Sequence, residues 1–523
     1  MARSNVKINI SFLASVISIV FIILMTIGSL TVVFFWSINK FTFLNSYEIK
    51  VLIFTLKQAL FSSFLACLLA IPIARAIFRN DFIFKRLFIN ILGLPFIFPV
   101  IAAVFSIILI FGNNGLINRG LEHYGFSQLS IYGINGIILI NIFFNLPLAI
   151  RFLLLAWNSI PIEQFKLARS LNIQSFDFFR LIEMPILRST LPVTFIIIFL
   201  ICITSFSVAL IMGGGPNSTT LEVAIYQALI FEFNFSKAAS LASIQFFLCG
   251  IIALFFVFLG EKNISFASMK INYFDTNYLN LKKNLFDWFW ILLTIFFLIF
   301  PIFFLFFKGF WGLFILPPSI YLAALNSLII ALFSGILGVC IALSIANFLI
   351  CSAFFSKYVE ILSIFILATS PIVMGTGIFL ILRPFINLEI LTPILVILIN
   401  ATMSLPFILR ALLPAMNKVS SDVGKLSDSL SITGFNRFKI IIFPNIFPVV
   451  SFCMGLGCAL SMGDLGVITL FSFGDIQTLP LAIFRLMMSY KMDYAFSGSV
   501  LLIILCFLLF YLFDNIGKLY ASS

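Results

Sequence analysis

Twelve apolar runs dominate this sequence, and each is long enough to cross the roughly 30 Å hydrocarbon core of a bilayer as a helix. They lie at about 9–36, 51–77, 87–111, 131–156, 190–212 and 239–260, and then at about 288–307, 320–350, 358–382, 391–414, 446–471 and 496–514. Only 10% of the 523 residues are charged, too few to cover the surface of a soluble protein. The sequence therefore predicts an all-α polytopic membrane protein with about twelve transmembrane helices.

The distribution of Lys and Arg predicts the orientation of the chain. With a cytoplasmic N-terminus, the cytoplasmic ends and loops hold 22 of the 31 basic residues, in agreement with the positive-inside rule. Both termini are then cytoplasmic, and the first run is an uncleaved span because it is too long for a signal peptide. The net charge of +12 is explained by topology and by contact with anionic membrane lipid, so no nucleic-acid partner is expected.

The cysteines and the single histidine exclude several kinds of site. All eight cysteines lie in apolar runs without CxxC spacing, and His123 is the only histidine. The cysteines therefore indicate small buried residues, and neither a metal site nor a disulfide framework is expected.

Short patterns show that the two sets of six runs are related. Three recur in the same order: Asn-x4-Leu-Pro-x3-Arg at 141–151 and 400–410, Ala-Leu-Phe-Ser at 59–62 and 331–334, and Thr-Leu-x2-Ala-Ile-Tyr/Phe at 220–226 and 478–484. An even number of spans per unit makes the two copies parallel. We predict a first half at 1–260, a cytoplasmic linker at 261–287 and a second half at 288–523, with a substrate path between the halves.

Two charged loops interrupt the apolar runs at matching places, Pro161–Pro185 and Ser420–Pro444. In the first, the sequence predicts a short helix behind Pro161, a turn at 171–173 and a second helix ended by Pro185. Phe165, Leu167, Phe178 and Phe179 need a groove, either in the same bundle or in a partner. Because the loops are duplicated, we expect equivalent docking onto a dimeric partner.

The first loop resembles the coupling loop of ABC-importer permeases, whose pattern is E-A-A-x3-G, nine residues, then I-x-L-P. The later part is matched at 182–185 and 441–444, whereas Lys or Ser occupies several earlier positions. Asn172 and Ser431 replace the glycine, and asparagine tolerates a left-handed backbone better than serine. We therefore expect the second loop to be the more degenerate of the two.

The resemblance implies that these loops bind an ATPase. The implied contact residues are Glu163, Lys166, Ala168, Arg169, Leu171, Asn172 and Pro185 in the first loop, and Asp422, Lys425, Ser427, Leu430, Ser431 and Pro444 in the second.

The chain also resembles, over nearly its whole length, the fused permeases of bacterial thiamine ABC importers. The matching stretches are 205–206, 213–216, 219–222, 224–229, 460–467, 470–471, 475, 478–480 and 489–490. The resemblance implies an inner-membrane importer of thiamine or its phosphates, with two ATPase copies and a periplasmic thiamine-binding protein as partners. No Gly-x4-Gly-Lys-Ser/Thr loop occurs, so the chain is not expected to hydrolyse ATP, and no cofactor is implied.

Two other transporter classes remain open at this stage. Fused iron(III) permeases share the twelve-span layout. A 6+6 secondary transporter would carry G-x3-D-R-x-G-R-R after its second span, and the corresponding stretch, Arg75–Asp81, lacks that motif.

Asp464 is the strongest single candidate for a residue that lines the substrate path. It lies in an apolar run, where a carboxylate is costly, and thiamine is a cation. The alternative is a structural role through backbone hydrogen bonds near Gly463 and Gly466. Ser205 occupies the equivalent position in the first half. Gly214, Gly215 and Pro216 predict an external turn, with contact to the binding protein as the functional alternative.

Overall fold

The computed structural model describes residues 10–39, 45–82, 85, 88–89, 92–93, 98–171, 175–213, 215–259, 285–351, 365–366, 369–383, 388–429, 434–471 and 476–522. The predicted linker falls almost wholly outside these ranges. The described elements are all helical. Eleven helices within these ranges are long and apolar enough to cross a membrane. The predicted all-α polytopic fold is confirmed.

The first half begins with α1 (Ile10–Ile23), which continues through the π-helix η1 (Leu24–Gly28) into α2 (Ser29–Asn39). The other elements are α3 (Ser46–Arg79), α5 (Val100–Phe111), α6 (Leu116–His123), α7 (Ile134–Asn158), α8 (Ile162–Ser170), α9 (Ser175–Phe178), η3 (Phe179–Glu183), α10 (Met184–Ile203), α11 (Phe206–Met212), η4 (Pro216–Ser218), α12 (Leu221–Ile230) and α13 (Phe235–Leu259).

The second half repeats this order. Its elements are α14 (Leu285–Gly309), η6 (Trp311–Ile315), α15 (Pro318–Cys351), α17 (Pro371–Leu382), α18 (Leu388–Ser429), α19 (Gly434–Arg437), η8 (Phe438–Ile442), α20 (Phe443–Met462), α21 (Gly466–Phe471), α22 (Leu479–Met488) and α23 (Met492–Ser522). Of the predicted run 358–382, the structure describes residues 365–366 and 369–382, and the latter include α17.

Local sequence signals set several helix ends. Helix α3 begins with a capping box, in which Asn45 Oδ1 accepts the Ser46 N–H at 2.8 Å and Glu48 Oε2 accepts the Asn45 N–H at 3.0 Å. The apolar runs before the two charged loops, 131–156 and 391–414, end at nearly equivalent positions of the repeat, but the helices that contain them end at different positions. Helix α7 ends at Asn158, whereas α18 continues to Ser429.

The first helices of the two halves are exchanged. Helix α1 packs on α15, and α2 packs on α17 and α13, while α14 packs on α3 and α5. Gly377 allows close packing, because a Cβ there would meet the backbone of α2 at Ser29. Each half therefore completes its neighbour, and the predicted halves interlock.

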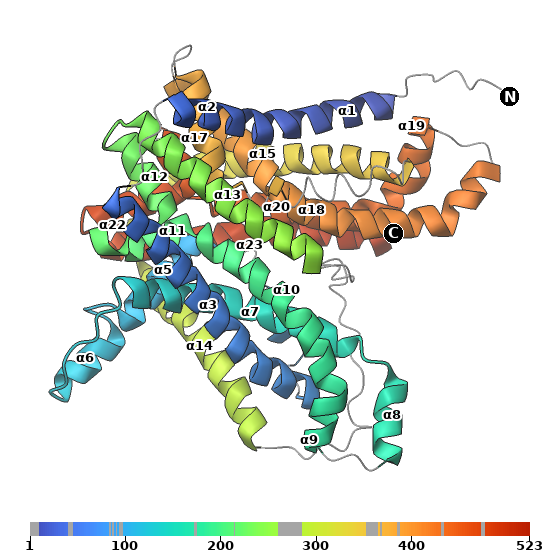
Figure 1. The fold of residues 1–523 in the computed structure, drawn as a ribbon, viewed down its shortest axis with the longest axis horizontal. Coiled ribbons are helices and arrows are strands. Elements are labelled where there is room, and N and C mark those ends of the chain that lie inside the picture. The colour runs from blue at the N-terminus through green and yellow to red at the C-terminus, as the bar shows by residue number, and fades with distance from the viewer. Residues whose placement is uncertain are drawn as a thin grey trace.

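The helices of the two halves meet at one end and diverge toward the other (Figure 1). Helices α11, α12 and α22 lie at the meeting end, and α8, α9 and α19 lie at the divergent end. Helix α1 contacts α19, and the Tyr520 ring near the end of α23 lies 4.5 Å from that of Phe447. Both charged loops, the start of α1 and the end of α23 thus share one end of the molecule.

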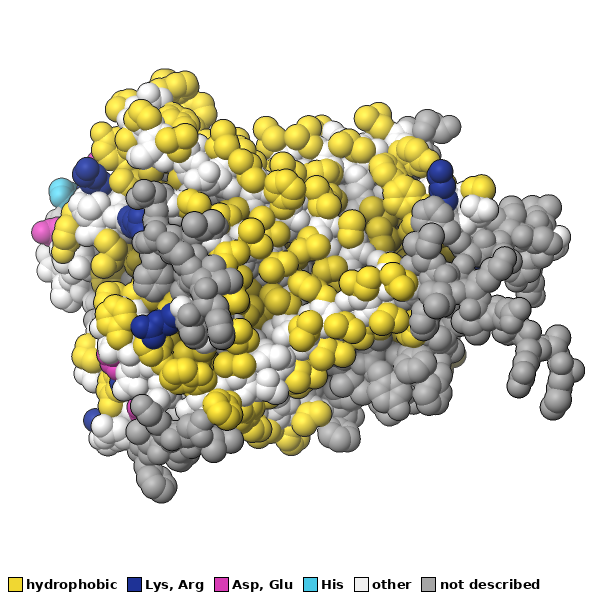
Figure 2. All heavy atoms as spheres, turned by 90° about the horizontal axis from the view of Figure 1, so that it is seen from above, with side chains coloured by type: hydrophobic (Ala, Val, Ile, Leu, Met, Phe, Trp, Pro, Cys, Tyr) yellow, Lys and Arg dark blue, Asp and Glu magenta, His cyan; other side chains and the backbone are white. Residues whose placement is uncertain are grey.

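The outer surface is apolar across its middle. Figure 2 shows hydrophobic side chains covering the centre of one face, with Lys and Arg at its margins. Large side chains such as Phe296, 61% exposed, face outward on α14. A band of this kind is what a lipid bilayer covers.

Candidate functional site

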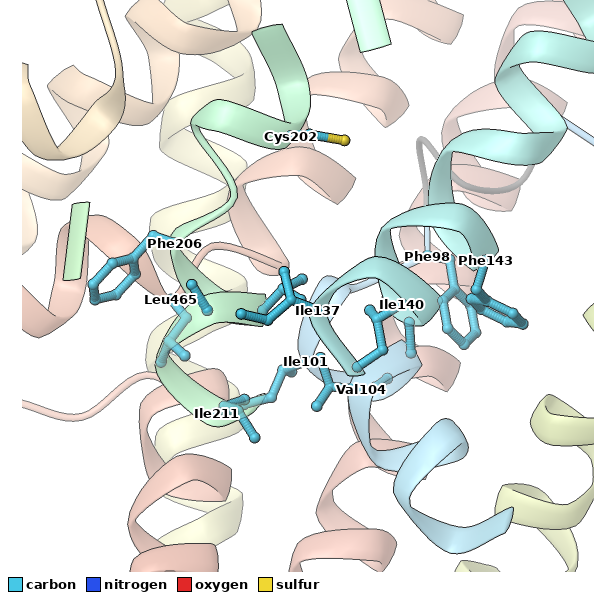
Figure 3. Packing of buried hydrophobic residues seen from close by; sticks show 14 of the residues in the cluster. Phe98, Ile101, Val104, Ile137, Ile140, Phe143, Cys202, Phe206, Ile211 and Leu465 are labelled. Carbon is cyan, nitrogen blue, oxygen red and sulfur yellow. The ribbon is translucent and has the colours of Figure 1, made fainter. Parts of the chain in front are cut away.

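Two helix breaks, one from each half, lie next to each other. The chain breaks between α10 and α11 at Thr204–Ser205, and between α20 and α21 at Gly463–Leu465. Figure 3 shows Phe206 and Leu465, the residues after Ser205 and Asp464, next to each other. A Cβ on Gly466 would lie 3.5 Å from Phe206 Cδ1. The equivalent breaks of the two halves are therefore in contact.

Asp464 caps the helix that follows its break. Its Oδ1 accepts the Gly466 N–H and its Oδ2 accepts the Val467 N–H, each at 3.2 Å. This is the usual role of an aspartate before a helix, and it is the structural alternative considered for this residue. Ser205 Oγ donates to the Cys202 carbonyl at 2.9 Å and so closes the end of α10. Both side chains are half-buried, and their contact with substrate stays a prediction.

The repeated asparagine of each half joins the same three spans. Asn141 Nδ2 donates to Gln58 Oε1 at 3.1 Å, and Gln58 Nε2 donates to the Cys202 carbonyl at 2.8 Å. In the second half, Asn400 Nδ2 donates to Ser461 Oγ, which donates to Ser334 Oγ, both at 3.0 Å. These buried, satisfied amides pin each bundle together, which explains why the pattern recurs.

The repeated Thr-Leu pair also has a structural explanation. The Leu221 N–H donates to Thr55 Oγ1 at 2.9 Å, and the Leu479 N–H donates to Ser327 Oγ at 2.7 Å. Each bond ties the first turn of α12 or α22 to the second span of its half. The two repeated stretches therefore make the same kind of hydrogen bond at corresponding positions.

Glu222 is a buried carboxylate whose importance sequence reasoning missed. Its side chain is 0% exposed, and its Oε1 accepts from Gln245 Nε2 at 2.8 Å. A charged residue in the apolar stretch 221–230 was the available signal. In the sequence, Glu222 stands out only as part of the matching stretch 219–222.

The first charged loop has an inner and an outer face. The Phe165 ring lies 5.5 Å from Phe178 and 6.1 Å from Phe78, and Ala168 is 5% exposed. Phe178 is buried and Phe179 packs against the core, so the protein supplies their groove itself. Leu167 and Leu171 are 61% and 64% exposed, beside the exposed Glu163 and Lys166. The outer face of α8 is therefore the part of the loop that is free to bind a partner.

An ion pair anchors this loop to the bundle. Arg75 Nε of α3 lies 2.7 Å from Glu183 Oε2, at an angle that departs from that of a hydrogen bond. The guanidinium also lies 4.7 Å from the centre of the Phe179 ring. In the second half the place of Glu183 is taken by Ile442, which is buried in an apolar cluster. The two loops are thus attached by different chemistry.

The second loop differs in form. Pro161 precedes α8, whereas Ser420 occupies the matching position and α18 runs through it without a break. Asp422 is exposed and Pro444 is half-buried. The backbones of Lys425 and Ser427 lie in α18, but their side chains, like that of Arg169, are outside the described part. Asn172, Leu430 and Ser431 also lie outside the described residues, and Pro185 is exposed.

The predicted external turn lies at the end opposite the loops. Gly215 has φ of +139°, which favours glycine, and the 3₁₀ turn Pro216–Ser218 follows it. Gly214 lies outside the described residues. The turn borders a pocket of about 370 Å³ that Lys50 and Lys57 also line. In the described part of the chain, no group of three or more His, Cys, Asp or Glu side chains could hold a metal ion.

Comparison with known proteins gives a consistent result. No family model matches the chain. It is 35% identical over 485 residues to the thiamine transport system permease protein of Brucella abortus (strain 2308), covering 90% of this chain and 88% of that protein. It is 32% identical to the protein of the same name from Escherichia coli (strain K12), covering 90% of each chain. Identity to the Haemophilus influenzae protein of that name is 32% over 519 residues, or 95% of each chain.

Proposed function

The chain belongs to the family of thiamine transport system permease proteins, and from this premise we propose that it forms the membrane path of an ATP-driven importer that carries thiamine or its phosphates into the cell. The observation that carries the proposal is similarity to three such permeases over 90–95% of the chain. This favours thiamine over the iron(III) and secondary-transporter alternatives. The chain is a transporter subunit.

A separate ATPase subunit drives transport, and two copies of it bind the two charged loops. The exposed Leu167 of α8 and Leu171, directly after this helix, support this assignment, because they form an apolar, solvent-facing patch beside the contacts of Phe165 with Phe178. The position of α9 and α19 at one end of the molecule also supports it, since a dimer could reach both.

The loops transmit closure of the ATPase dimer to the spans. Because Arg75 and Glu183 join the first loop to α3, movement of the loop moves the helices with it. The two halves then rock about their contact at the other end, where a periplasmic thiamine-binding protein delivers substrate beside the turn at Gly215 and Pro216. In this arrangement the loops and both termini are cytoplasmic and the membrane is the inner membrane.

Reconstitution tests the proposal. The permease, its ATPase and its binding protein are placed in proteoliposomes with ATP inside the compartment that the loops face, and uptake of labelled thiamine is measured. We expect accumulation that requires ATP and all three proteins. Uptake of ferric iron in place of thiamine, or thiamine uptake without the ATPase, would overturn the proposal.

A further inference from the structure

A buried polar cluster joins the two halves beside the two helix breaks. Glu222 of α12 and Gln245 of α13 come from the first half, and Ser370, the N-cap of α17, comes from the second. Helix α12, which carries Glu222, packs against α17, which Ser370 caps, and against α21, which Asp464 caps. Glu222 and Gln245 are both 0% exposed and Ser370 is 1% exposed. The cluster is thus sealed between elements of opposite halves.

The charges of this cluster are not balanced by protein cations. Among the described residues, neither Glu222 nor Asp464 forms an ion pair with Lys or Arg. Within the described ranges, Glu222 Oε2 and Gln245 Oε1 are buried and have no hydrogen-bond partner. Because Gln245 donates its amide to Glu222, its free carbonyl oxygen lies beside the same carboxylate. Buried acceptors of this kind are unfavourable unless a hydrogen-bond donor or a positive group meets them.

The second half shows that the fold does not require this carboxylate. The turn that begins α12 is repeated at α22, with the same hydrogen bond from a leucine N–H to a hydroxyl of the second span. In that copy the residue after the leucine is Pro480. The structural pins at Asn141 and Asn400 are also neutral amides with satisfied hydrogen bonds. Glu222 is therefore an addition to the repeated framework.

Aromatic side chains border the same cluster. The rings of Phe206 and Tyr226 pack edge to face at 5.5 Å, and Tyr226 lies one turn after Glu222 on α12. Phe206 also contacts the second half at Gly466. Carboxylates together with aromatic rings are the groups that recognise organic cations in proteins.

We propose that Glu222, with the carbonyl oxygen of Gln245 and with Asp464 as a second carboxylate, forms a contact site for an organic cation between the two halves. This inference rests on the proposed function, which supplies thiamine as the cation. Its thiazolium ring carries a permanent positive charge and no N–H on the charged nitrogen, so it is held by charge and by ring faces. Its aminopyrimidine N–H groups suit the free oxygens of Glu222 and Gln245.

The test compares a cation with an uncharged substrate of the same shape. Proteoliposomes containing the complete importer are supplied with thiamine or with the isostere in which carbon replaces the charged ring nitrogen. Uptake of each is measured for the native chain, for Glu222→Gln, which removes the charge with little change of shape, and for Glu222→Asp, which keeps it. Glu232→Gln is the matched control, because it makes the same change at an exposed position.

We expect Glu222→Gln to lower thiamine uptake by about tenfold, the size of effect that loss of one hydrogen bond to a charged group produces. Uptake of the neutral isostere should change less than about twofold, and Glu222→Asp should recover much of the thiamine uptake. ATPase co-purification reports that the variants fold. An equal fall for both substrates, or no fall for either, would overturn the inference. If the native importer takes up no thiamine, the proposed function itself fails.

Discussion

The ion pair between Glu183 and Arg75 attaches the first charged loop to α3. The Glu183 side chain is 2% exposed, and its partner belongs to another span. Removing one member of a buried ion pair leaves the other uncompensated, whereas replacing both by apolar residues of similar size costs little. The apolar residue Ile442 in the second half is a natural example of the second solution.

A double-mutant cycle tests this pair. We expect Arg75→Met to destabilise the solubilised permease by about 3 kcal/mol, because it leaves the buried Glu183 carboxylate uncompensated, and Glu183→Leu to cost less because the Arg75 left behind is partly exposed. The double variant should be more stable than Arg75→Met alone. Thermal unfolding of the purified protein measures all four forms, with Asp514→Asn, in an exposed pair with Lys518, as the control. Additive effects would show that the two residues are not coupled.

Charged residues such as Glu183 and Asp464 could be located from the sequence, but their interaction partners could not. Glu183 and Asp464 were visible in their motifs, yet the partner of Glu183 lies far away in the chain, and the backbone bonds of Asp464 depend on the break before α21. Glu222 became significant only when the fold placed it beside Gln245 and Ser370. Pairing across spans depends on helix rotation and packing, which a hydropathy pattern does not encode.

At the scale of the element, a single proline accounts for the difference in helix structure between the two loops. Pro161 disfavours helical backbone at the residue before it and offers no N–H, so α7 ends and α8 starts anew. Ser420 imposes neither restriction, and α18 continues. Hydropathy predicted the apolar run to about 414 because it detects contact with lipid, not the end of a helix. The break at Pro161 was predictable because its cause is local.

Leu167 of α8 and Leu171, directly after this helix, form an exposed leucine pair whose replacement should uncouple the ATPase. Replacing Leu167 and Leu171 together by Glu puts two charges on the patch, and we expect ATPase co-purification to fall by more than about tenfold. Ala168 is a poorer target, because it is buried and its replacement would disturb the seating of α8 itself.

Leu129→Glu provides the matched control for this prediction, since Leu129 is 57% exposed and belongs to the segment after α6, at the opposite end. Retention of the membrane protein at native levels shows that it has folded. Undiminished ATPase binding by the α8 variant would contradict docking at this face.

At the scale of the whole molecule, the sidedness of the structure makes a prediction about labelling. We expect a cysteine introduced at Leu167 to react with a membrane-impermeant maleimide only from the cytoplasm, and one at Tyr124 only from outside, because positive residues orient the chain. Both positions are exposed, and six of the seven cysteines whose side chains the structure describes are buried. Labelling of intact cells and of inverted vesicles measures the difference, with the native chain as background. The reverse pattern would invert the topology.

The exchanged first helices bear on how the chain is made. Helix α1 leaves the ribosome first, but its packing partner α15 follows only after the whole first half; in the finished protein the Ser15 hydroxyl donates to the Ser344 carbonyl at 2.7 Å. Until α15 is inserted, lipid or an insertion factor has to cover the face of α1 that later packs on α15. Joining both halves in one polypeptide keeps that partner at high effective concentration and fixes a ratio of one to one, so biosynthesis never leaves a first half without its second.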